Sequence, residues 1–170
     1  MRTAVFALLF ASASVSAQDV TLEYRVKAAY IYNFVRYVEY PPEALGESPI
    51  NICVAGRNPF GSLLDELVHG EDVAGRMLIV RVILEPEPGC HVIFIPRGAA
   101  MPSYMRAVGI APVLTVGETP EFAEAGGMIT FVQDGRNVRF EINQEAAAKA
   151  RLQISSRLLR LARPAPGTSR

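Results

Sequence analysis

A buried strand followed by a helix is predicted by residues 50–68, INICVAGRNPFGSLLDELV. Residues 50–55 form a short apolar run with β-branched side chains, which is typical of a strand buried on both faces. Gly56 begins a turn, and Asn58 can cap a helix that has Pro59 at its first position. This strand, turn and helix together form the basic unit of an α/β fold.

Similar apolar strands are predicted further along the chain, at residues 77–84, 91–95 and 112–116. Apolar strands that alternate with helices predict an α/β fold with a mostly parallel sheet, flanked by helices on both faces in three layers. The link 85–90 is too short for an ordinary crossover helix. It must be an extended crossover or a single turn, or else the strands beside it are antiparallel.

The C-terminal part is predicted to add an antiparallel hairpin. Asp134-Gly135 turns the strand at residues 128–132 back into a strand at residues 137–142. Two short helices follow, and their N-caps are expected at Asn143 and at Ser155 or Ser156.

The N-terminus has the pattern of a secretory signal peptide. Arg2 supplies the positive charge, and the apolar run at residues 4–11 is shorter than the roughly 20 residues that span a bilayer. Because Val15 and Ala17 fit a signal-peptidase site, we expect cleavage after Ala17 and a periplasmic location. An uncleaved membrane anchor is the alternative. The expected organisation is a signal peptide at 1–17, one domain at 18–163 and a disordered tail at 164–170.

The composition favours a globular domain and excludes a nucleic-acid-binding protein. Half of the residues are hydrophobic, which is enough for a sizeable core. The chain has 17 basic and 17 acidic side chains, so removing Arg2 leaves a net charge near −1. This balance provides no basic surface for nucleic acid and no polybasic segment for anionic lipid.

The two cysteines, Cys53 and Cys90, are most simply a disulfide in an exported protein. If the strand order is 2-1-3-4-5, their strands are neighbours, and the Cα atoms can lie within the roughly 4.4–6.8 Å that a disulfide needs. Two buried free thiols are the alternative. A metal site is not expected, because neither His69 nor His91 stands at ligand spacing from a cysteine.

The sequence shows no catalytic signature, and we expect neither an enzyme nor a cofactor. The nucleophile-elbow pattern is absent, and the acidic pairs Asp65-Glu66 and Glu71-Asp72 are typical of solvated surfaces. The loop at residues 56–61 lies between a strand and a helix, where α/β folds can bind anions. It matches no nucleotide-binding motif, so a tight turn and helix cap is the simpler interpretation.

A long helix predicted over residues 20–40, ended by Pro41-Pro42, carries two apolar rows. One row is Tyr24, Ala28, Ile31, Val35 and Val38, and the other is Lys27, Tyr30, Phe34 and Tyr37. A surface helix needs only one such stripe against its own core. Tyr30, Phe34 and Tyr37 are therefore candidate partner-binding residues, with burial under the final helix, through Leu158 and Leu159, as the alternative.

Several segments of the chain resemble the YfiR family of periplasmic proteins, in matching order over nearly all of residues 18–163. They are residues 26–41, VKAAYIYNFVRYVEYP; 90–95, CHVIFI; 126–129, GGMI; 138–143, VRFEIN; and 152–159, LQISSRLL. None of these segments is a catalytic motif.

The resemblance implies an α/β periplasmic regulator that forms a homodimer. The best-known member represses an inner-membrane diguanylate cyclase by binding its periplasmic sensor domain, and an outer-membrane lipoprotein sequesters the repressor. The output is cyclic di-GMP, which favours biofilm over motility. Cys53 and Cys90 match a disulfide position of the family, whereas a second disulfide of some members has no counterpart here.

Two classes of function remain open from the sequence. The first is a regulator that binds a membrane signalling protein, either a cyclase or another sensor. The second is a sensory domain that binds a small ligand at the strand ends around Gly56 and Gly117 and acts on a different membrane receptor.

Overall fold

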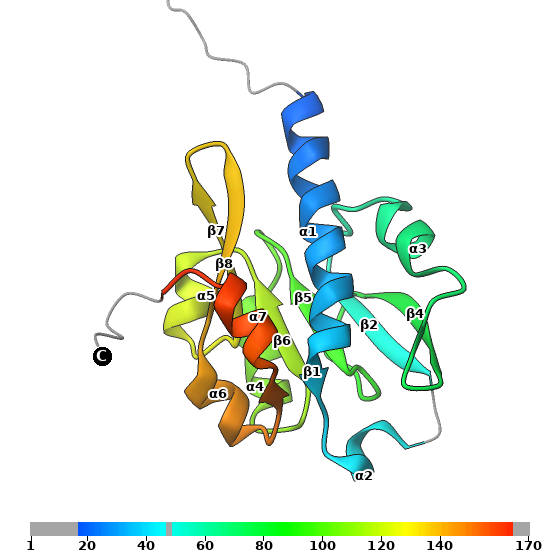
Figure 1. Cartoon of the computed structure of the whole chain (residues 1–170). Helices are drawn as coiled ribbons and strands as arrows, with labels where there is room; N and C mark the ends of the chain where they lie inside the picture. Colours follow the sequence, from blue (N-terminus) through cyan, green and yellow to red (C-terminus); the bar gives the residue numbers. More distant parts are fainter. Residues whose placement is uncertain (1–16, 47–48, 165–170) are drawn as a thin grey trace, which may run out of the picture.

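The computed structural model describes residues 17–46 and 49–164 of the 170-residue chain (Figure 1). Residues 1–16 of the predicted signal peptide and residues 165–170 of the predicted tail lie outside the described residues. Among the described helices, none is both long enough and apolar enough to cross a membrane.

A curled seven-stranded sheet forms the centre of the fold (Figure 1). Its strands, in spatial order, are β3 (Asp72–Val73), β4 (Arg76–Ile83), β2 (Ile50–Ala55), β5 (Val92–Ile95), β6 (Leu114–Gly117), β7 (Ile129–Asp134) and β8 (Asn137–Ile142). The five strands from β4 to β7 are parallel to their neighbours, whereas the terminal strands β3 and β8 are antiparallel.

The short link between β4 and β5 is an extended crossover. Both strands run parallel to β2 and lie on its two sides, so residues 84–91 return along the sheet without a helix. One of the three arrangements expected from the sequence is thereby confirmed. The strand order around β2 also agrees with the predicted order.

Seven helices are present in the described part of the chain. They are α1 (Ala17–Tyr37), α2 (Pro42–Leu45), α3 (Leu63–Val68), α4 (Met101–Val108), α5 (Pro120–Glu124), α6 (Gln144–Lys149) and α7 (Ser156–Leu161). The mixed α/β class and the C-terminal hairpin of β7 and β8 are confirmed. The regular three-layer arrangement stays a prediction.

The predicted ends of two helices were wrong. α1 ends at Tyr37 rather than at Tyr40, because the next residues form β1 (Val38–Glu39) and pair antiparallel with β9 (Gln153–Ile154). α3 begins at Leu63, because Asn58 caps only a turn, in which its Oδ1 accepts the backbone N–H of Phe60 at 2.9 Å.

The sheet separates two clusters of buried side chains. Ile52 and Val54 of β2 belong to the larger cluster, which α1, α3 and α7 share. Cys53 and Ala55, which alternate with them, belong to a smaller cluster with α4 and α5. Because alternate residues of a strand point to opposite faces, β2, β4 and β5 contribute to both clusters.

Several local predictions are confirmed in the C-terminal part. Asp134 pairs with Asn137, so the hairpin turn consists of two residues. Asn143 accepts the N–H of Ala146 at 3.0 Å, and Ser155 accepts that of Leu158 at 3.2 Å. These side-chain acceptors satisfy N–H groups that the first turn of a helix leaves without a partner.

Candidate functional site

The structure distributes the three predicted partner-binding residues of α1 between the core and the surface. Phe34 is fully buried, whereas Tyr30 and Tyr37 are partly buried. The aromatic ring of Tyr30 stacks on that of Phe34 at a centroid distance of 6.0 Å.

The hairpin of β7 and β8 covers much of the second row of α1. The ring of Phe34 lies 5.0 Å from that of Phe140 and 5.8 Å from that of Phe131, measured between centroids. Tyr30 also packs on Phe140 at 5.1 Å. The expectation that Phe34 is available as a surface anchor is therefore contradicted, because the aromatic residues of the hairpin fill the space around it.

Tyr37 lies beside α7 at the other end of the row. The guanidinium of Arg157 stands 5.8 Å from the centre of the Tyr37 ring, within the range of a cation–π contact. Leu158 of α7 is buried, and Leu159 packs against the same cluster from a partly buried position. Tyr37 and Tyr30 are thus the members of the predicted set that reach the surface.

A buried ion pair connects α1 to the end of β6. Lys27 and Glu118 form a salt bridge, and their side chains are only 3 % and 1 % exposed. Glu23, one turn before Lys27, pairs with the same ammonium group. Burial of charged groups is costly unless they are paired and hydrogen-bonded, and each charge in this cluster has a partner of opposite sign.

Every oxygen of the Glu118 carboxylate has a partner. Oε2 accepts from Lys27, and Oε1 accepts the hydroxyl of Tyr24 at 3.0 Å and the backbone N–H of Arg97 at 2.7 Å. Burial and the nearby charge of Glu118 raise the pKa of Tyr24 above its usual value. The cluster therefore fixes α1 against the loops that follow β5 and β6, and its polar groups are already engaged.

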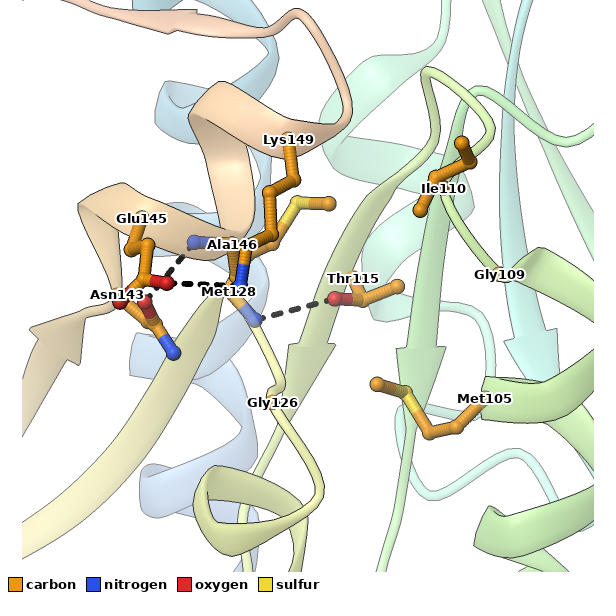
Figure 2. Close-up of a pocket in the computed structure, with 10 residues that line it drawn as sticks. All are labelled: Met105, Gly109, Ile110, Thr115, Gly126, Met128, Asn143, Glu145, Ala146 and Lys149. Atoms are coloured by element: carbon orange, nitrogen blue, oxygen red, sulfur yellow. Dashed lines mark hydrogen bonds and ion pairs between the residues drawn. The ribbon is translucent and has the colours of Figure 1, made fainter.

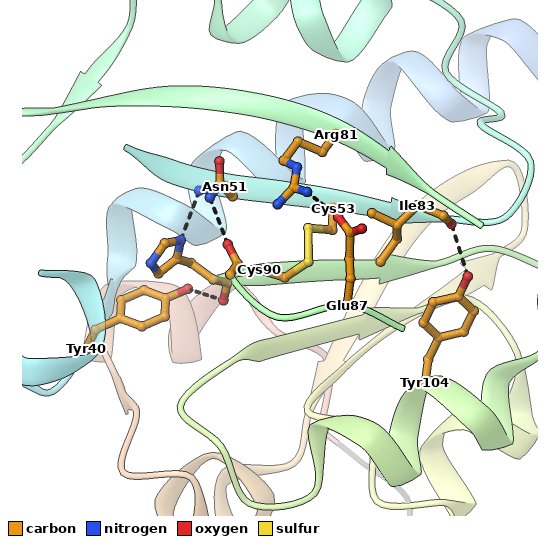
Figure 3. Close-up of a disulfide and its surroundings, with 10 residues drawn as sticks. Tyr40, Asn51, Cys53, Arg81, Ile83, Glu87, Cys90 and Tyr104 are labelled. Atoms are coloured by element: carbon orange, nitrogen blue, oxygen red, sulfur yellow. Dashed lines mark hydrogen bonds and ion pairs between the residues drawn. A yellow bond between two sulfur atoms is a disulfide. The ribbon is translucent and has the colours of Figure 1, made fainter. Parts of the chain in front are cut away.

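The predicted disulfide is confirmed, and it attaches the crossover to the sheet (Figure 3). Cys53 of β2 and Cys90 have a Cα–Cα distance of 5.8 Å, within the expected range. Asn51 donates from its side chain to the carbonyl of Gly89 at 2.8 Å. Arg81 and Glu87 form an ion pair on the same crossover. These contacts hold the extended link where a helix would otherwise cover the sheet.

His91, the residue after the bridge, is buried and has a structural role. Its Nδ1 accepts the backbone N–H of Asn51 at 3.0 Å, and its carbonyl accepts the hydroxyl of Tyr40 at 3.0 Å. Burial lowers the pKa of His91, the nearby Arg76 lowers it further, and a hydrogen bond to the backbone of Ala44 partly offsets both effects. The other histidine, His69, is exposed at the end of α3.

Side chains fill the two strand ends that were predicted to bind a ligand. A Cβ placed on Gly117 would come within 2.3 Å of the Phe122 ring, so α5 packs directly on this glycine. Gly56 has a positive φ of 68°, and a Cβ there would contact Ala99 at 3.6 Å. The glycines serve close packing and a turn, in agreement with the simpler interpretation of residues 56–61.

A shallow pocket instead lies near the opposite ends of β6 and β7 (Figure 2). Its volume is about 180 Å³, which is below the roughly 300 Å³ at which small-molecule sites usually begin. Met105 and Ile110 face Met128 across it, with Thr115 between them (Figure 2). No local sequence pattern predicts this pocket, because its lining residues come from four separate segments.

The described residues contain no group of three or more His, Cys, Asp or Glu side chains that could hold a metal ion. The four carboxylates of the acidic pairs 65–66 and 71–72 are exposed, and Glu71 accepts the hydroxyl of Tyr32.

Comparisons with known proteins agree with the fold. A family model described as YfiR/HmsC-like matches residues 24–163. A solved structure, a conserved domain protein from Vibrio cholerae O1 biovar eltor, is 14 % identical with a TM-score of 0.50. The alignment covers 83 % of this chain and 59 % of that protein, so the likeness concerns the fold of a part of it. A comparison with curated protein sequences gave no match.

Proposed function

This chain belongs to the YfiR/HmsC-like family, and on that premise we propose that it represses a membrane signalling protein by binding its periplasmic sensor domain. The family supports a periplasmic regulator in the general sense. The observation that carries the proposal is the match over residues 24–163, which includes nearly all of the described fold. The target we propose is a diguanylate cyclase of the inner membrane, and the output is cyclic di-GMP.

The structure supports a role in binding rather than in chemistry. Its buried charged cluster, Lys27 with Glu23 and Glu118, is internally paired, and the buried His91 has backbone partners on its ring. Such satisfied groups stabilise a fold but have no free capacity for acid–base catalysis. We therefore propose that the protein acts through its surface and requires no cofactor.

The proposed docking surface is the exposed side of α1 around Tyr30 and Tyr37. Aromatic residues at the edge of a packed row are frequent anchors at interfaces, because they combine a large apolar area with a polar group. Phe34 does not belong to this surface, because its side chain is fully buried and its ring stacks against the inner side of the Tyr30 ring. We further propose that an outer-membrane lipoprotein sequesters the repressor. The signal peptide is cleaved in the mature protein, and the protein acts as a homodimer.

The test is binding of the purified protein to the detergent-solubilised cyclase encoded nearest to its gene. We expect Tyr37→Ala to weaken the complex by about tenfold or more, as truncation of an aromatic anchor does. Tyr32→Ala is the matched control, because Tyr32 lies on the same helix but is hydrogen-bonded to Glu71. Removing the gene should raise cellular cyclic di-GMP, and unchanged levels together with absent binding would refute the cyclase as the target.

A small-ligand sensor is the second candidate, and the pocket beside Thr115 favours it only for a ligand of a few atoms, since its volume is about 180 Å³. A ligand would be held between the apolar Met105, Ile110 and Met128, near the side chains of Asn143 and Lys149. A ligand that binds only the folded state raises its melting temperature. A screen of periplasmic metabolites that gave such a shift, abolished by Met128→Lys, would favour this function over direct repression.

A further inference from the structure

The charged side chains of this chain are separated in space, although their total is balanced. Residues 137–163, which include β8, α6, β9 and α7, carry six basic and two acidic side chains. Residues 63–90, which include α3, β3, β4 and the extended crossover, carry two basic and six acidic ones. The first segment lies mainly on one side of α1 and the second mainly on the other (Figure 1). The molecule therefore has a basic end and an acidic end.

At the basic end, α7 is fixed to the rest of the fold at both of its ends and on its inner face. Just before the helix, the backbone N–H of Ser155 donates to the carbonyl of Tyr37 at 3.0 Å. Just after it, the N–H of Arg163 donates to the carbonyl of Phe140 at 2.8 Å. Leu158, on the inner face, is buried in the larger cluster. The outer side chains of α7 therefore project from fixed positions.

The outer face of α7 consists of Arg157, Arg160 and Leu161. Residues three and four apart in a helix are neighbours on its surface, so the three side chains lie together. All three are exposed, and Leu161 is 59 % exposed. Within the described residues, no carboxylate forms a salt bridge with Arg157 or Arg160. The face thus presents two positive charges beside an exposed apolar side chain.

This face is continuous with the proposed docking surface on α1. The guanidinium of Arg157 lies 5.8 Å from the centre of the Tyr37 ring, and its Nη1 donates to the Tyr37 hydroxyl at 3.5 Å. Tyr and Arg are enriched among the residues that contribute most to protein–protein binding. A guanidinium also matches the geometry of a carboxylate, which it can bind through two parallel hydrogen bonds. The chemistry of α7 therefore suits a partner that is acidic where it contacts Tyr37.

We propose that the outer face of α7 binds an acidic surface of the partner protein, with Arg157 and Arg160 contacting carboxylates and Leu161 contacting an apolar side chain beside them. This inference rests on the proposed function, because it names the chemistry of the partner at the docking surface that includes Tyr37. The same partner surface repels the acidic end of the molecule, so the two ends together orient the approaching chain. Charge complementarity of this kind acts mainly on the rate of association.

The features of α7 fit an acidic protein better than an anionic lipid surface. Segments that bind such lipids by charge carry clusters of about four to eight Lys or Arg, and interfacial helices insert several apolar side chains. The outer face of α7 offers two Arg and one exposed Leu. The nearest aromatic ring, Tyr37, is partly buried and in contact with Arg157. A small face with two fixed charges therefore matches a localised group of carboxylates.

The first test measures the association rate of the purified chain with the detergent-solubilised cyclase at several ionic strengths. We expect the rate constant to fall about tenfold or more as the ionic strength rises, and by a similar factor at low ionic strength in the Arg157→Glu, Arg160→Glu double variant. Arg160→Lys keeps the charge and should stay within about twofold of the natural chain. Arg106→Glu is the matched control, because Arg106 is exposed on α4, which packs on the other face of the sheet.

The second test uses a poly-glutamate peptide, which does not depend on the identity of the partner. The natural chain and Arg106→Glu should bind this peptide at low ionic strength, and the double variant should not. If this result holds but the cyclase does not bind, the cyclase is the wrong target and the acidic class of partner is supported.

Two results would overturn the inference while leaving the proposed docking in place. They are a cyclase complex that the double variant forms at the natural rate, and peptide binding that survives the charge reversal on α7. A chain that binds phosphatidylglycerol vesicles through α7 but does not bind the peptide would also overturn it, because α7 would then contact a membrane.

Discussion

At the scale of single residues, the protonation of His91 links stability to pH. Its folded-state pKa lies below the ordinary value of about 6.5, chiefly because the ring is buried. The unfolded chain therefore binds a proton more readily, and stability is fully present above the unfolded pKa. It is lost as the pH falls from about 7 through the folded-state pKa, because a protonated ring cannot accept the Asn51 N–H.

We predict that the free energy of unfolding decreases between about pH 7 and pH 5 and that His91→Gln removes part of this decrease. Denaturant titration at several pH values measures the effect. His69→Gln is the control for the loss of an imidazole from the chain, because His69 is exposed at the end of α3. Equal slopes for the natural chain and His91→Gln would contradict the assignment.

A second residue-scale prediction concerns Phe34. Its ring is enclosed by Phe131 and Phe140, so Phe34→Ala should lower the free energy of unfolding by about 3–5 kcal/mol. The folded fraction should still bind the membrane partner, unlike Tyr37→Ala. Thermal unfolding and binding measured on the same preparation separate the two effects. A Phe34→Ala protein with normal stability but weak binding would show that Phe34 belongs to the binding interface.

The Lys27–Glu118 pair shows which residue-level features the sequence cannot reveal. The two residues are 91 positions apart, and no local pattern connects them. The signal that was available is the placement of Lys27 in an otherwise apolar row of α1, which implies a buried charge in need of a partner. The partner itself depends on where the end of β6 lies, and this is a property of the assembled sheet.

At the scale of elements, the disulfide stabilises a crossover that has no helix. The bridge joins residues 37 apart in the sequence, and the chain-entropy model gives roughly 3–4 kcal/mol for a loop of this size. We predict that the Cys53→Ser, Cys90→Ser double variant melts roughly 10 °C lower than the oxidised chain. Calorimetry with and without reductant measures this, and the reduced natural chain should match the variant. A variant as stable as the oxidised chain would show that the remaining contacts of the crossover suffice.

The elements that the sequence predicted well are those with a local physical cause. The hairpin at Asp134 and the caps at Asn143 and Ser155 each depend on side chains within a few positions. The end of α1 was predicted less well. Val38 and Glu39 continue the helical pattern, but pairing with Gln153 and Ile154 draws them into a strand, and this competition is decided by a segment more than 100 residues away.

At the scale of the whole molecule, the strand order around β2 followed from the alternation of strands and helices. The parallel sheet and the neighbouring positions of β2 and β5 are consistent with the general rule for doubly wound folds. The proposed docking surface did not follow from the sequence to the same degree. Whether Tyr30, Phe34 or Tyr37 reaches the surface depends on where the β7–β8 hairpin packs.

The meeting of the first and last elements has a consequence for how the chain acquires its structure during synthesis. α1 packs on α3, but also on β8 and α7, and in the described part of the chain β1 pairs with β9, so one side of α1 is covered by elements that lie more than 100 residues further along the chain. Contacts between segments so distant in the chain form slowly, and the aromatic row of α1 remains exposed until they do. A nascent chain that lacks its C-terminal hairpin cannot complete the larger core, and we therefore expect a holding chaperone to recognise α1 before any regulatory partner does.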